Sequence, residues 1–391
     1  MRQAARLRLV FVITALKSGG AERMLWKLLS RIDRSRFEPF VIALSRDSDR
    51  IVQAFQDIDV PCELLGMRPG RVSLGPVVRL ARRLRSLGPD IVQGWMYHGN
   101  LAATVASAAL GGHVPVLWNI RGALDSSHDR RPTGFVIWAG GKLSGTSARI
   151  INNSIVSALQ HEQRFGYESS RRVILPNGFD VDAFRPSVQA RKIMRESLHL
   201  PSDSVLVGLI GHYRSMKDHP GFLHAASLLH QRYPQVHYVL AGDRIDDTNS
   251  ELNSLISTYG LRARVHLLGN RDDTQVIQAA LDVAVSSSAS GEGFPNVIGE
   301  AMSCGVPCVV TDVGDSAVVV GDTGIVVPPK NPEALAGSIA GLIDGGETHR
   351  RELGARARQR IIDRFGLDSV VRQYETLYTV VDAEYRARRG V

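Results

Sequence analysis

Cysteine is scarce in this sequence, which contains only Cys62, Cys304 and Cys308 among its 391 residues. So few thiols exclude a disulfide-stapled scaffold and favour a reducing compartment. Cys304 and Cys308 also have no further cysteine or histidine at zinc-ligand spacing, so we predict no metal site.

Long hydrophobic runs are missing as well. The apolar run from Leu9 to Leu16 follows basic residues, but a Gly-Gly pair and an amphipathic helical pattern come next, without a small-residue cleavage pattern. No run reaches the ~20 residues that a membrane-spanning helix needs. We therefore predict that the N-terminal run is a buried first strand.

Acidic residues are outnumbered by basic ones. Lys and Arg total 47 against 39 Asp and Glu, which gives a formal net charge of +8. This balance suits an anionic partner, either a phosphorylated ligand, a membrane surface or nucleic acid. We find no recognised nucleic-acid-binding module and predict no nucleic-acid partner; salt-dependent gel shifts would test that rival.

The length of the chain predicts two domains of roughly 150–200 residues each. Short apolar runs alternate with helical patterns up to about Pro176, as in the βαβ units of a parallel, doubly wound sheet. The stretch "LPNGFDVDAFRPS" interrupts this rhythm with turn residues, and the alternation restarts at "SVLVGLIG". We therefore predict a first Rossmann-like domain at 1–176, a linker at 177–187 and a second Rossmann-like domain at 188–365.

An α/β protein with two tandem Rossmann-like domains has a preferred place for its ligand. In such sheets ligands bind beyond the carboxyl ends of the strands. Two domains facing across a cleft would therefore hold the ligand between them.

Two glutamates follow one of the predicted strands. "LDVAVSSS" leads into "ASGEGFPNVIGEAMSCG", so Glu292 lies in a loop at the carboxyl end of a strand. Pro295 suits the first turn of a helix that ends at Gly305. Glu300 then lies five residues after Pro295, roughly 7.5 Å along the helix axis. The two carboxylates can therefore grip different parts of one elongated ligand, and the free N–H groups between them attract an anion.

The stretch "SGEGFPNVIGEAMSCGVPCVVTD" resembles the E-x7-E motif of retaining glycosyltransferases with the GT-B fold, specifically glycosyltransferase family 4. "SGGAER" is similar to the family's first glycine loop and "PNGFDVDAFRP" to its interdomain linker. "MKDH", "LAGD", "LLGNRDD" and "CGVPCVVTDVGDSAVVVGDTGIVVPPKNPEAL" are similar to its donor-binding domain. "RFGLDSVVRQYETLY" is similar to its closing helix, which implies that residues 366–391 return to the N-terminal domain.

The resemblance implies a role for each matching position of the donor site. Glu300 would bind the ribose hydroxyls of the nucleotide, and Glu292 would contact the donor sugar or the leaving group. The backbone amides of Gly293 and Phe294 would hold sugar and phosphate, whereas Pro295 has no N–H to offer.

The resemblance also implies cations at the departing pyrophosphate, because retaining enzymes of this fold use no metal. Lys217 in "HYRSMKDH" matches the family's pyrophosphate lysine. The resemblance also places Gly211 in the donor site. The family has an arginine directly after this glycine, where this chain has His212, so either Arg214 or a protonated His212 must supply the second charge. We favour Arg214, because a guanidinium stays charged and can bind phosphate through two hydrogen bonds.

Four further residues complete the predicted site. Gly19 and Gly20 follow the first strand and open a helix, where glycine lets a backbone approach a phosphate closely. His98 follows another strand and would, by resemblance, touch the donor sugar, although a lone histidine often only packs or caps. Arg271 in "GNRDD" would line the pocket of the nucleotide base.

Together with the scarcity of cysteine, the resemblance implies a cytoplasmic, metal-independent, retaining glycosyltransferase without a cofactor. It would move a hexosyl or N-acetylhexosaminyl group from a nucleotide sugar, with UDP favoured over GDP, to a glycan or lipid-linked acceptor in cell-surface polysaccharide or glycolipid synthesis. Asp180 and Asp182 have the spacing of a metal-binding pair, but they fall in the linker and we assign them no metal. A nucleotide-sugar epimerase of the same fold is the alternative, and incubation with donor alone would separate the two because an epimerase needs no acceptor.

A basic amphipathic helix is predicted at 76–87. It carries Arg79, Arg82, Arg83 and Arg85 beside several leucines. Such a helix can lie on an anionic membrane surface, which would place the protein on the inner face of the cytoplasmic membrane; a solvated face of an ordinary Rossmann helix is the alternative. "GFVIWAGGKL" at 134–143 is a second, weaker membrane candidate.

Overall fold

The computed structural model describes residues 6–16, 19–45, 51–67, 74–124 and 131–390. The chain divides into two compact units. Unit one comprises the residues up to Gly178 together with Leu367–Val391, and unit two comprises Phe179–Gly366. The chain therefore crosses between the units twice, and residues 179–187 of the predicted linker belong to unit two.

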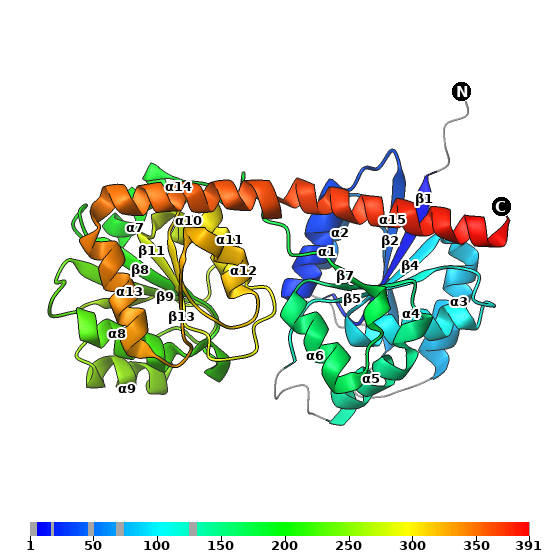
Figure 1. The fold of residues 1–391 in the computed structure, drawn as a ribbon, viewed down its shortest axis with the longest axis horizontal. Coiled ribbons are helices and arrows are strands. Elements are labelled where there is room, and N and C mark those ends of the chain that lie inside the picture. Colours follow the sequence, from blue (N-terminus) through cyan, green and yellow to red (C-terminus); the bar gives the residue numbers. More distant parts are fainter. Residues whose placement is uncertain (1–5, 17–18, 46–50, 68–73, 125–130, 391) are drawn as a thin grey trace. The chain divides into compact units, whose positions relative to one another are not determined.

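Unit one is a parallel seven-stranded sheet with helices on both faces (Figure 1). The strand order is β3-β2-β1-β4-β5-β6-β7. The strands are β1 (Leu7–Ile13), β2 (Phe37–Ser45), β3 (Cys62–Met67), β4 (Ile91–Trp95), β5 (Val116–Ile120), β6 (Arg149–Asn152) and β7 (Arg172–Ile174). The α-helices are α1 (Gly20–Arg31), α2 (Ile51–Gln56), α3 (Leu74–Leu87), α4 (Met96–Ala108), α5 (Arg131–Leu143), α6 (Ile155–Phe165) and α15 (Leu367–Arg389).

Unit two is a parallel six-stranded sheet, again between helices (Figure 1). The strand order is β10-β9-β8-β11-β12-β13. The strands are β8 (Val205–Ile210), β9 (Val236–Ala241), β10 (Val265–Leu267), β11 (Val283–Ser286), β12 (Cys308–Thr311) and β13 (Ile325–Val327). The α-helices are α7 (Val188–Ser197), α8 (His219–Leu229), α9 (Ser250–Thr258), α10 (Thr274–Ala280), α11 (Asn296–Ser303), α12 (Ser316–Val320), α13 (Pro332–Asp344) and α14 (Gly346–Phe365).

Each central strand buries both of its faces. In β1, Leu9, Phe11 and Ile13 belong to one core cluster, which includes side chains of α1 and α15. Val10 and Val12 belong to a second cluster, which includes side chains of α3 and α4. Because successive side chains of a strand point to opposite faces, a continuous apolar run is what a sheet covered by helices on both sides requires.

The C-terminal helix α15 completes the core of unit one. Val370, Tyr374 and Tyr378 are buried in the first cluster at helical spacing. The Tyr378 hydroxyl donates a hydrogen bond of 2.6 Å to the Gln93 side chain of β4, and the Glu375 carboxylate accepts one of 2.8 Å from the backbone N–H of Asp33. Unit one is therefore built from two segments that lie far apart in the sequence.

The strand orders confirm the predicted α/β class with two Rossmann-like domains. In each sheet the order reverses at one point, between β1 and β4 in unit one and between β8 and β11 in unit two. Ligands of doubly wound sheets bind at the carboxyl ends of the strands beside this switch point. The loops that follow these four strands are therefore where a site is expected.

The starts of two helices position predicted site residues. Helix α4 begins at Met96, directly after β4, so His98 lies in its first turn. The abrupt turn uses a left-handed backbone at Met96, with φ of 65°, and Gly99 lets the helix approach β1, since a Cβ there would lie 2.3 Å from the Val12 carbonyl oxygen. Helix α11 begins after Pro295, whose ψ of 110° is extended.

Candidate functional site

The centre of the candidate site is an ion pair at the switch point of unit two. Lys217 ends a short 3-10 turn after β8, and Glu292 lies in the loop after the neighbouring strand β11. The Lys217 Nζ atom lies 2.5 Å from Glu292 Oε1, and the Ser288 hydroxyl donates a 2.6 Å hydrogen bond to the same oxygen. Their side chains are 19% and 9% exposed, so the pair is largely removed from water and retains a partly open cation.

Hydrogen bonds tie the two loops of the pair together. The Ser287 hydroxyl donates to the Lys217 carbonyl oxygen at 2.8 Å. The backbone N–H of Ala289 donates to the Met216 carbonyl oxygen, also at 2.8 Å. The positions of the ammonium and the carboxylate are therefore set by the backbones of both loops, which is the support a binding site needs.

A glycine turn supports the Glu292 loop from the other side. Gly314 has a φ of +62°, and a Cβ there would lie 2.3 Å from the Glu292 carbonyl oxygen. The next residue, Asp315, donates a 2.9 Å backbone hydrogen bond to the Gly293 carbonyl oxygen. Glycine is required at 314 for both its backbone conformation and this close approach.

Phe294 and Glu300 lie at and after the turn that leads into α11. The Phe294 ring is buried, stacks on Phe179 at 6.0 Å between ring centres and meets Phe365 edge-on at 5.4 Å. Its side chain therefore anchors the loop, and a contact to a ligand is left to its backbone. Glu300 is half-buried, four residues after α11 begins, about 6 Å along the helix axis.

Arg214 is placed where a second cation can act. Its backbone is extended, with φ of −141° and ψ of 149°, and its side chain is exposed. Within the described part of the chain, the Arg214 guanidinium has no hydrogen bond or ion pair. The Arg214 carbonyl accepts a 2.9 Å hydrogen bond from the Lys217 N–H, so the two cations belong to one turn.

We expect Arg214→Ala to lower kcat/KM about tenfold to a hundredfold, because hydrogen bonds to charged groups contribute roughly 1.5–3 kcal/mol. His212→Ala, the matched control, should change kcat/KM little, and His212→Arg in the Arg214→Ala background should restore part of the loss. Steady-state kinetics across pH check this. The opposite pattern, with His212→Ala severely impaired and the wild-type rate falling as pH rises through about 6–8, would assign the contact to a protonated histidine.

Gly211, predicted to approach the donor, lies under the lysine. A Cβ at Gly211 would be 3.6 Å from Lys217 Cδ, which is ordinary contact. The close approach is instead at Gly242, which directly follows β9. A Cβ there would lie 2.2 Å from the Gly211 carbonyl oxygen, and its φ is +149°. Gly242 is therefore the glycine that the loop after β8 requires.

The predicted residues of unit one lie at its own switch point. Gly19 and Gly20 join β1 to α1, and His98 lies in the first turn of α4 after β4. The Glu22 carboxylate is close to Gly19, since a Cβ at Gly19 would lie 2.3 Å from its oxygen. His98 is half-buried, and burial lowers the pKa of its imidazole. At neutral pH it is therefore a neutral ring that can accept or donate one hydrogen bond.

Arg271 is engaged by its own loop. Its guanidinium donates two hydrogen bonds to the Asp273 carboxylate, of 2.7 and 2.5 Å. Both side chains are partly exposed, at 42% and 37%. This pairing holds the guanidinium against its own loop, so a contact to a base in this region would come from the backbone after β10.

Two family matches cover both units. Residues 18–183 match the family described as Glycosyltransferase Family 4, and residues 190–360 match the family described as Glycosyl transferases group 1. The chain belongs to the GT-B glycosyltransferases of the family 4 type. Its fold matches a crystal structure of Anabaena HepE in complex with UDP and glucose, with a TM-score of 0.81 and 24% identity over 95% of this chain and 99% of that one.

Two curated relatives match parts of this family 4 chain. It is 30% identical over 223 residues to an exopolysaccharide phosphotransferase of Streptomyces coelicolor, covering 56% of this chain and 22% of that protein. It is 26% identical over 213 residues to UDP-Gal:alpha-D-GlcNAc-diphosphoundecaprenol alpha-1,3-galactosyltransferase of Escherichia coli, covering 52% and 53%. The chain thus spans about a fifth of the first relative's length and about half of the second's.

His219 is a component of the site that the sequence analysis missed. It is the first residue of α8, its exposed fraction is 0%, and its ring packs on Tyr213 at 5.2 Å. Neither ring nitrogen has a hydrogen bond to a described residue, although the Gly211 backbone lies close enough to favour the charged form. Burial, and then the charge of Lys217, lower the pKa of His219 to about 4. In the sequence, only its position two residues after Lys217 indicated that His219 lies near the site.

This burial predicts acid sensitivity. An unfolded histidine titrates near ~6.5, so the unfolded chain binds a proton before His219 does in the folded protein. The free energy of unfolding should therefore fall as pH drops from about 6.5 to about 4, by up to about 3 kcal/mol for this residue. Urea unfolding at several pH values should show a shallower fall for His219→Gln than for wild type. The exposed His349→Gln is the control, and equal slopes for all three proteins would contradict the assignment.

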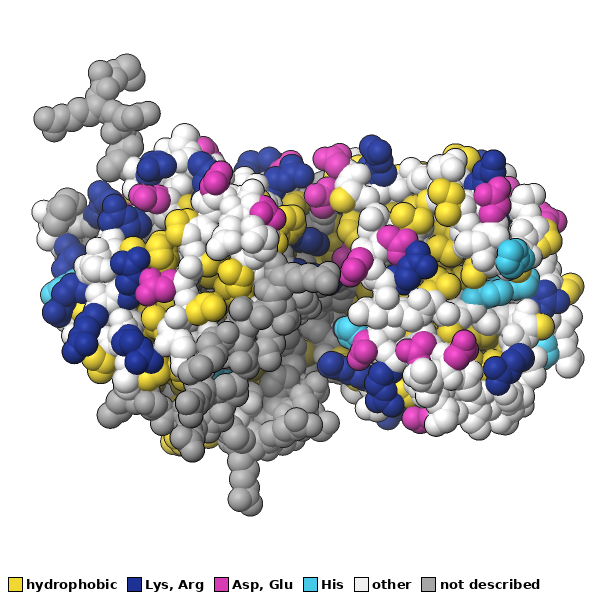
Figure 2. Space-filling model, turned by 180° about the vertical axis from the view of Figure 1, so that it is seen from behind, with side chains coloured by type: hydrophobic (Ala, Val, Ile, Leu, Met, Phe, Trp, Pro, Cys, Tyr) yellow, Lys and Arg dark blue, Asp and Glu magenta, His cyan; other side chains and the backbone are white. Residues whose placement is uncertain are grey.

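The predicted basic helix is part of the domain. Leu80 and Leu84 of α3 are buried in the core. Arg79 donates to the Leu65 carbonyl oxygen at 3.0 Å, and Arg83 pairs with Glu63 at 2.6 Å. The apolar side of α3 therefore packs into the domain core and is not free to enter a membrane. On the face in Figure 2, Lys and Arg side chains gather toward the left edge of unit one, with single acidic side chains among them.

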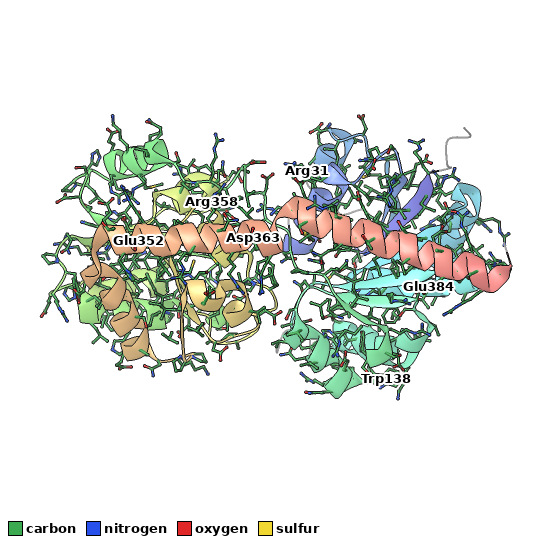
Figure 3. All side chains as sticks on the ribbon, turned by 45° about the horizontal axis from the view of Figure 1, so that its top comes forward. Arg31, Trp138, Glu352, Arg358, Asp363 and Glu384 are labelled. Carbon is green, nitrogen blue, oxygen red and sulfur yellow. The ribbon has the colours of Figure 1, made fainter. Side chains whose placement is uncertain are left out.

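The second membrane candidate, on α5, leaves aromatic rings in solvent. Phe135 and Trp138 are 64% and 50% exposed and lie 5.7 Å apart between ring centres (Figure 3 labels Trp138). None of the described helices combines the length and the apolar composition needed to cross a membrane. Among the same residues, no group of three or more His, Cys, Asp or Glu side chains is arranged to hold a metal ion.

Proposed function

We propose that this protein transfers a sugar from a nucleotide-sugar donor, with retention of anomeric configuration, to a glycan or lipid-linked acceptor in polysaccharide or glycolipid synthesis. The observation that carries the proposal is the pairing of Lys217 with Glu292 at the switch point of unit two. A doubly wound sheet binds its ligand there, and a buried carboxylate beside a partly exposed ammonium suits a ligand that carries both hydroxyls and phosphates.

The chemistry follows from the charges. Glycosyl transfer leaves a nucleoside diphosphate, and the developing negative charge needs fixed donors. The Lys217 ammonium has three N–H groups and gives one to Glu292, so others can meet the leaving phosphate together with Arg214. Glu292 holds the lysine in place and can accept a hydrogen bond from a sugar hydroxyl. We assign no dedicated base, and propose that the leaving phosphate takes the acceptor's proton without a metal ion.

UDP is the proposed nucleotide, with a hexose or N-acetylhexosamine as the sugar. The HepE structure of the same fold holds UDP and glucose, and the name of the Escherichia coli relative specifies a UDP-galactose donor and a lipid-diphosphate acceptor. These proteins support the class of substrate. We propose unit two for the donor and unit one for the acceptor.

Donor screening followed by product analysis tests the function. A nucleotide sugar at 100 times its Kd should stabilise the protein by about 2.7 kcal/mol in a thermal-shift screen. Incubation of that donor with polyprenyl-diphosphate sugars should then give an axial or equatorial product bond that matches the donor, as seen by NMR, and excess chelator should not change the rate. Conversion of the donor sugar without any acceptor would make the protein an epimerase.

We expect Glu300→Ala to weaken binding of the free nucleoside diphosphate about tenfold or more. The proposed contact is an ionised hydrogen bond to the ribose hydroxyls, worth roughly 1.5–3 kcal/mol. Titration calorimetry with UDP measures the loss, and Glu333→Ala, an exposed glutamate at the start of α13, is the control. Unchanged UDP affinity in a folded Glu300→Ala variant would remove Glu300 from the ribose.

A further inference from the structure

A groove on unit two lies apart from the Lys217–Glu292 pair. It is lined by the start of α7, by the residues that follow α10 and α11, and by one side of α14, and its volume is about 460 Å³. Small-molecule sites in proteins span roughly 300–1,000 Å³. The pair precedes the first turn of α11, whereas the groove begins at Cys304, after its last. The eight residues of α11, about 12 Å of helix, therefore separate the two places.

The groove has a largely apolar lining. Pro186, Val188, Leu281, Val306 and Ile362 all contribute to it. Val188 and Ile362 keep 85% and 38% of their surface exposed to solvent. When an apolar group covers concave apolar surface that is exposed to water, the free energy of the system falls. The lining therefore favours a ligand with a hydrocarbon or aromatic body.

Arg358 of α14 gives the groove a positive charge (Figure 3). Its guanidinium donates hydrogen bonds to three backbone carbonyl oxygens, those of Val181 and Phe184 at 3.0 Å each and that of Ser303. These neutral acceptors fix the planar group without cancelling its charge. A guanidinium has five N–H donors, so it retains donors for a further acceptor.

Two more arginines add to this charge. Arg191 pairs with Asp282 at 2.6 Å, but the same carboxylate also pairs with Arg195 at 2.6 Å, so two cations share one anion. Arg351 is 75% exposed and forms a surface pair with Glu347 at 2.6 Å, a kind of pair that contributes little. No aspartate or glutamate is among the described residues that line the groove. The potential in the groove therefore favours an anion.

We propose that this groove binds a small amphipathic anion, in which a carboxylate or phosphate group is carried on an apolar body. The apolar side chains take the body, and the arginines of α7 and α14 take the oxyanion, for which a guanidinium offers paired donors. Neither a neutral alcohol of the same length nor inorganic phosphate satisfies both halves of the lining. Glu300, the proposed ribose contact, lies one helical turn before Cys304 but is not among the residues that line the groove, so we expect the anion to bind whether or not a nucleotide is present.

Titration calorimetry with octanoate and octyl phosphate tests the proposal, and comparison of the two shows which oxyanion is preferred. At least one should bind one to one, about tenfold or more tighter than octanol and inorganic phosphate, and with the same affinity when UDP is present. If neither octyl anion binds more tightly than octanol, or if UDP displaces it, the proposal fails. The donor proposal is tested separately, because nucleotide binding in the thermal-shift screen does not depend on this groove.

Variants at the edge of the groove locate the binding. Arg351→Glu and Ile362→Glu each place a negative charge in the lining and should weaken binding of the preferred octyl anion about tenfold or more. Arg364→Glu makes the same charge change on α14 outside the lining and should leave the affinity within about twofold. Both targets are partly exposed, so the fold should survive, and melting curves verify it. An equal loss with Arg364→Glu, or no loss with either groove variant, would overturn the assignment.

Discussion

Lys217→Ala should lower kcat/KM by about a hundredfold to a thousandfold, the loss expected when one fixed donor to a developing anion is removed. The ammonium lies 2.5 Å from Glu292, and backbone hydrogen bonds tie the two loops that carry the pair, so the lysine is held in a fixed position for the leaving phosphate. Steady-state rates measured over a range of donor and acceptor concentrations separate the effect on kcat from that on KM.

The same substitution leaves the Glu292 carboxylate buried without its cation, which costs stability. Lys217→Arg is therefore the matched control: it keeps the charge and the ion pair, and it should retain more of the rate than Lys217→Ala. The variant Glu292→Gln in the Lys217→Ala background should recover stability but not activity. A Lys217→Ala enzyme that works within about threefold of wild type would make the ion pair a structural feature and remove the lysine from the phosphate site.

Asp282→Ala should lower the free energy of unfolding by about 3–5 kcal/mol, the usual cost of breaking a buried ion pair from one side. The carboxylate is 6% exposed. It accepts hydrogen bonds from Arg191 and Arg195 at 2.6 Å each and from the backbone N–H of Leu206 at 2.8 Å. Its removal would leave two guanidinium groups beside each other without an anion. Urea unfolding followed by circular dichroism measures the loss.

Asp344→Ala provides the comparison for Asp282. Asp344 also pairs with an arginine, Arg232, at 3.2 Å, but the two side chains are 50% and 70% exposed. Exposed pairs contribute about 0–1 kcal/mol, so this variant should unfold almost as the wild type does. Similar losses for the two variants would show that burial of the Asp282 pair does not control its contribution.

The positions of Lys217 and Glu292 in the fold could be predicted from the sequence, but their contact could not. Each follows a run of apolar residues that is recognisable as a strand, so each was expected at a strand's carboxyl end. They are 75 residues apart in the chain, and they meet because β8 and β11 are neighbours in the sheet. Strand order is a property of the whole domain, and short-range patterns do not contain it.

His219 and α3 show a second limit. The sequence shows that His219 follows Lys217, but its complete burial depends on how α8 packs against the loop after β8. For α3, periodicity separates an apolar side from a basic side correctly. It does not say what the apolar side meets, and the same pattern suits a membrane and a domain core. In the structure Leu80 and Leu84 pack into the core, a choice made by tertiary contacts.

The two chain crossings make unit two an insertion within unit one. Unit two is a single uninterrupted segment, Phe179–Gly366, whereas unit one is assembled from segments on both sides of it. A chain that stopped at Gly366 would contain all of unit two but lack α15. The resulting gap would be in the core of unit one, because α15 packs there. The side chains that Val370, Tyr374 and Tyr378 cover would then be open to water. During synthesis, unit two can therefore reach its final packing while unit one still waits for α15 to leave the ribosome.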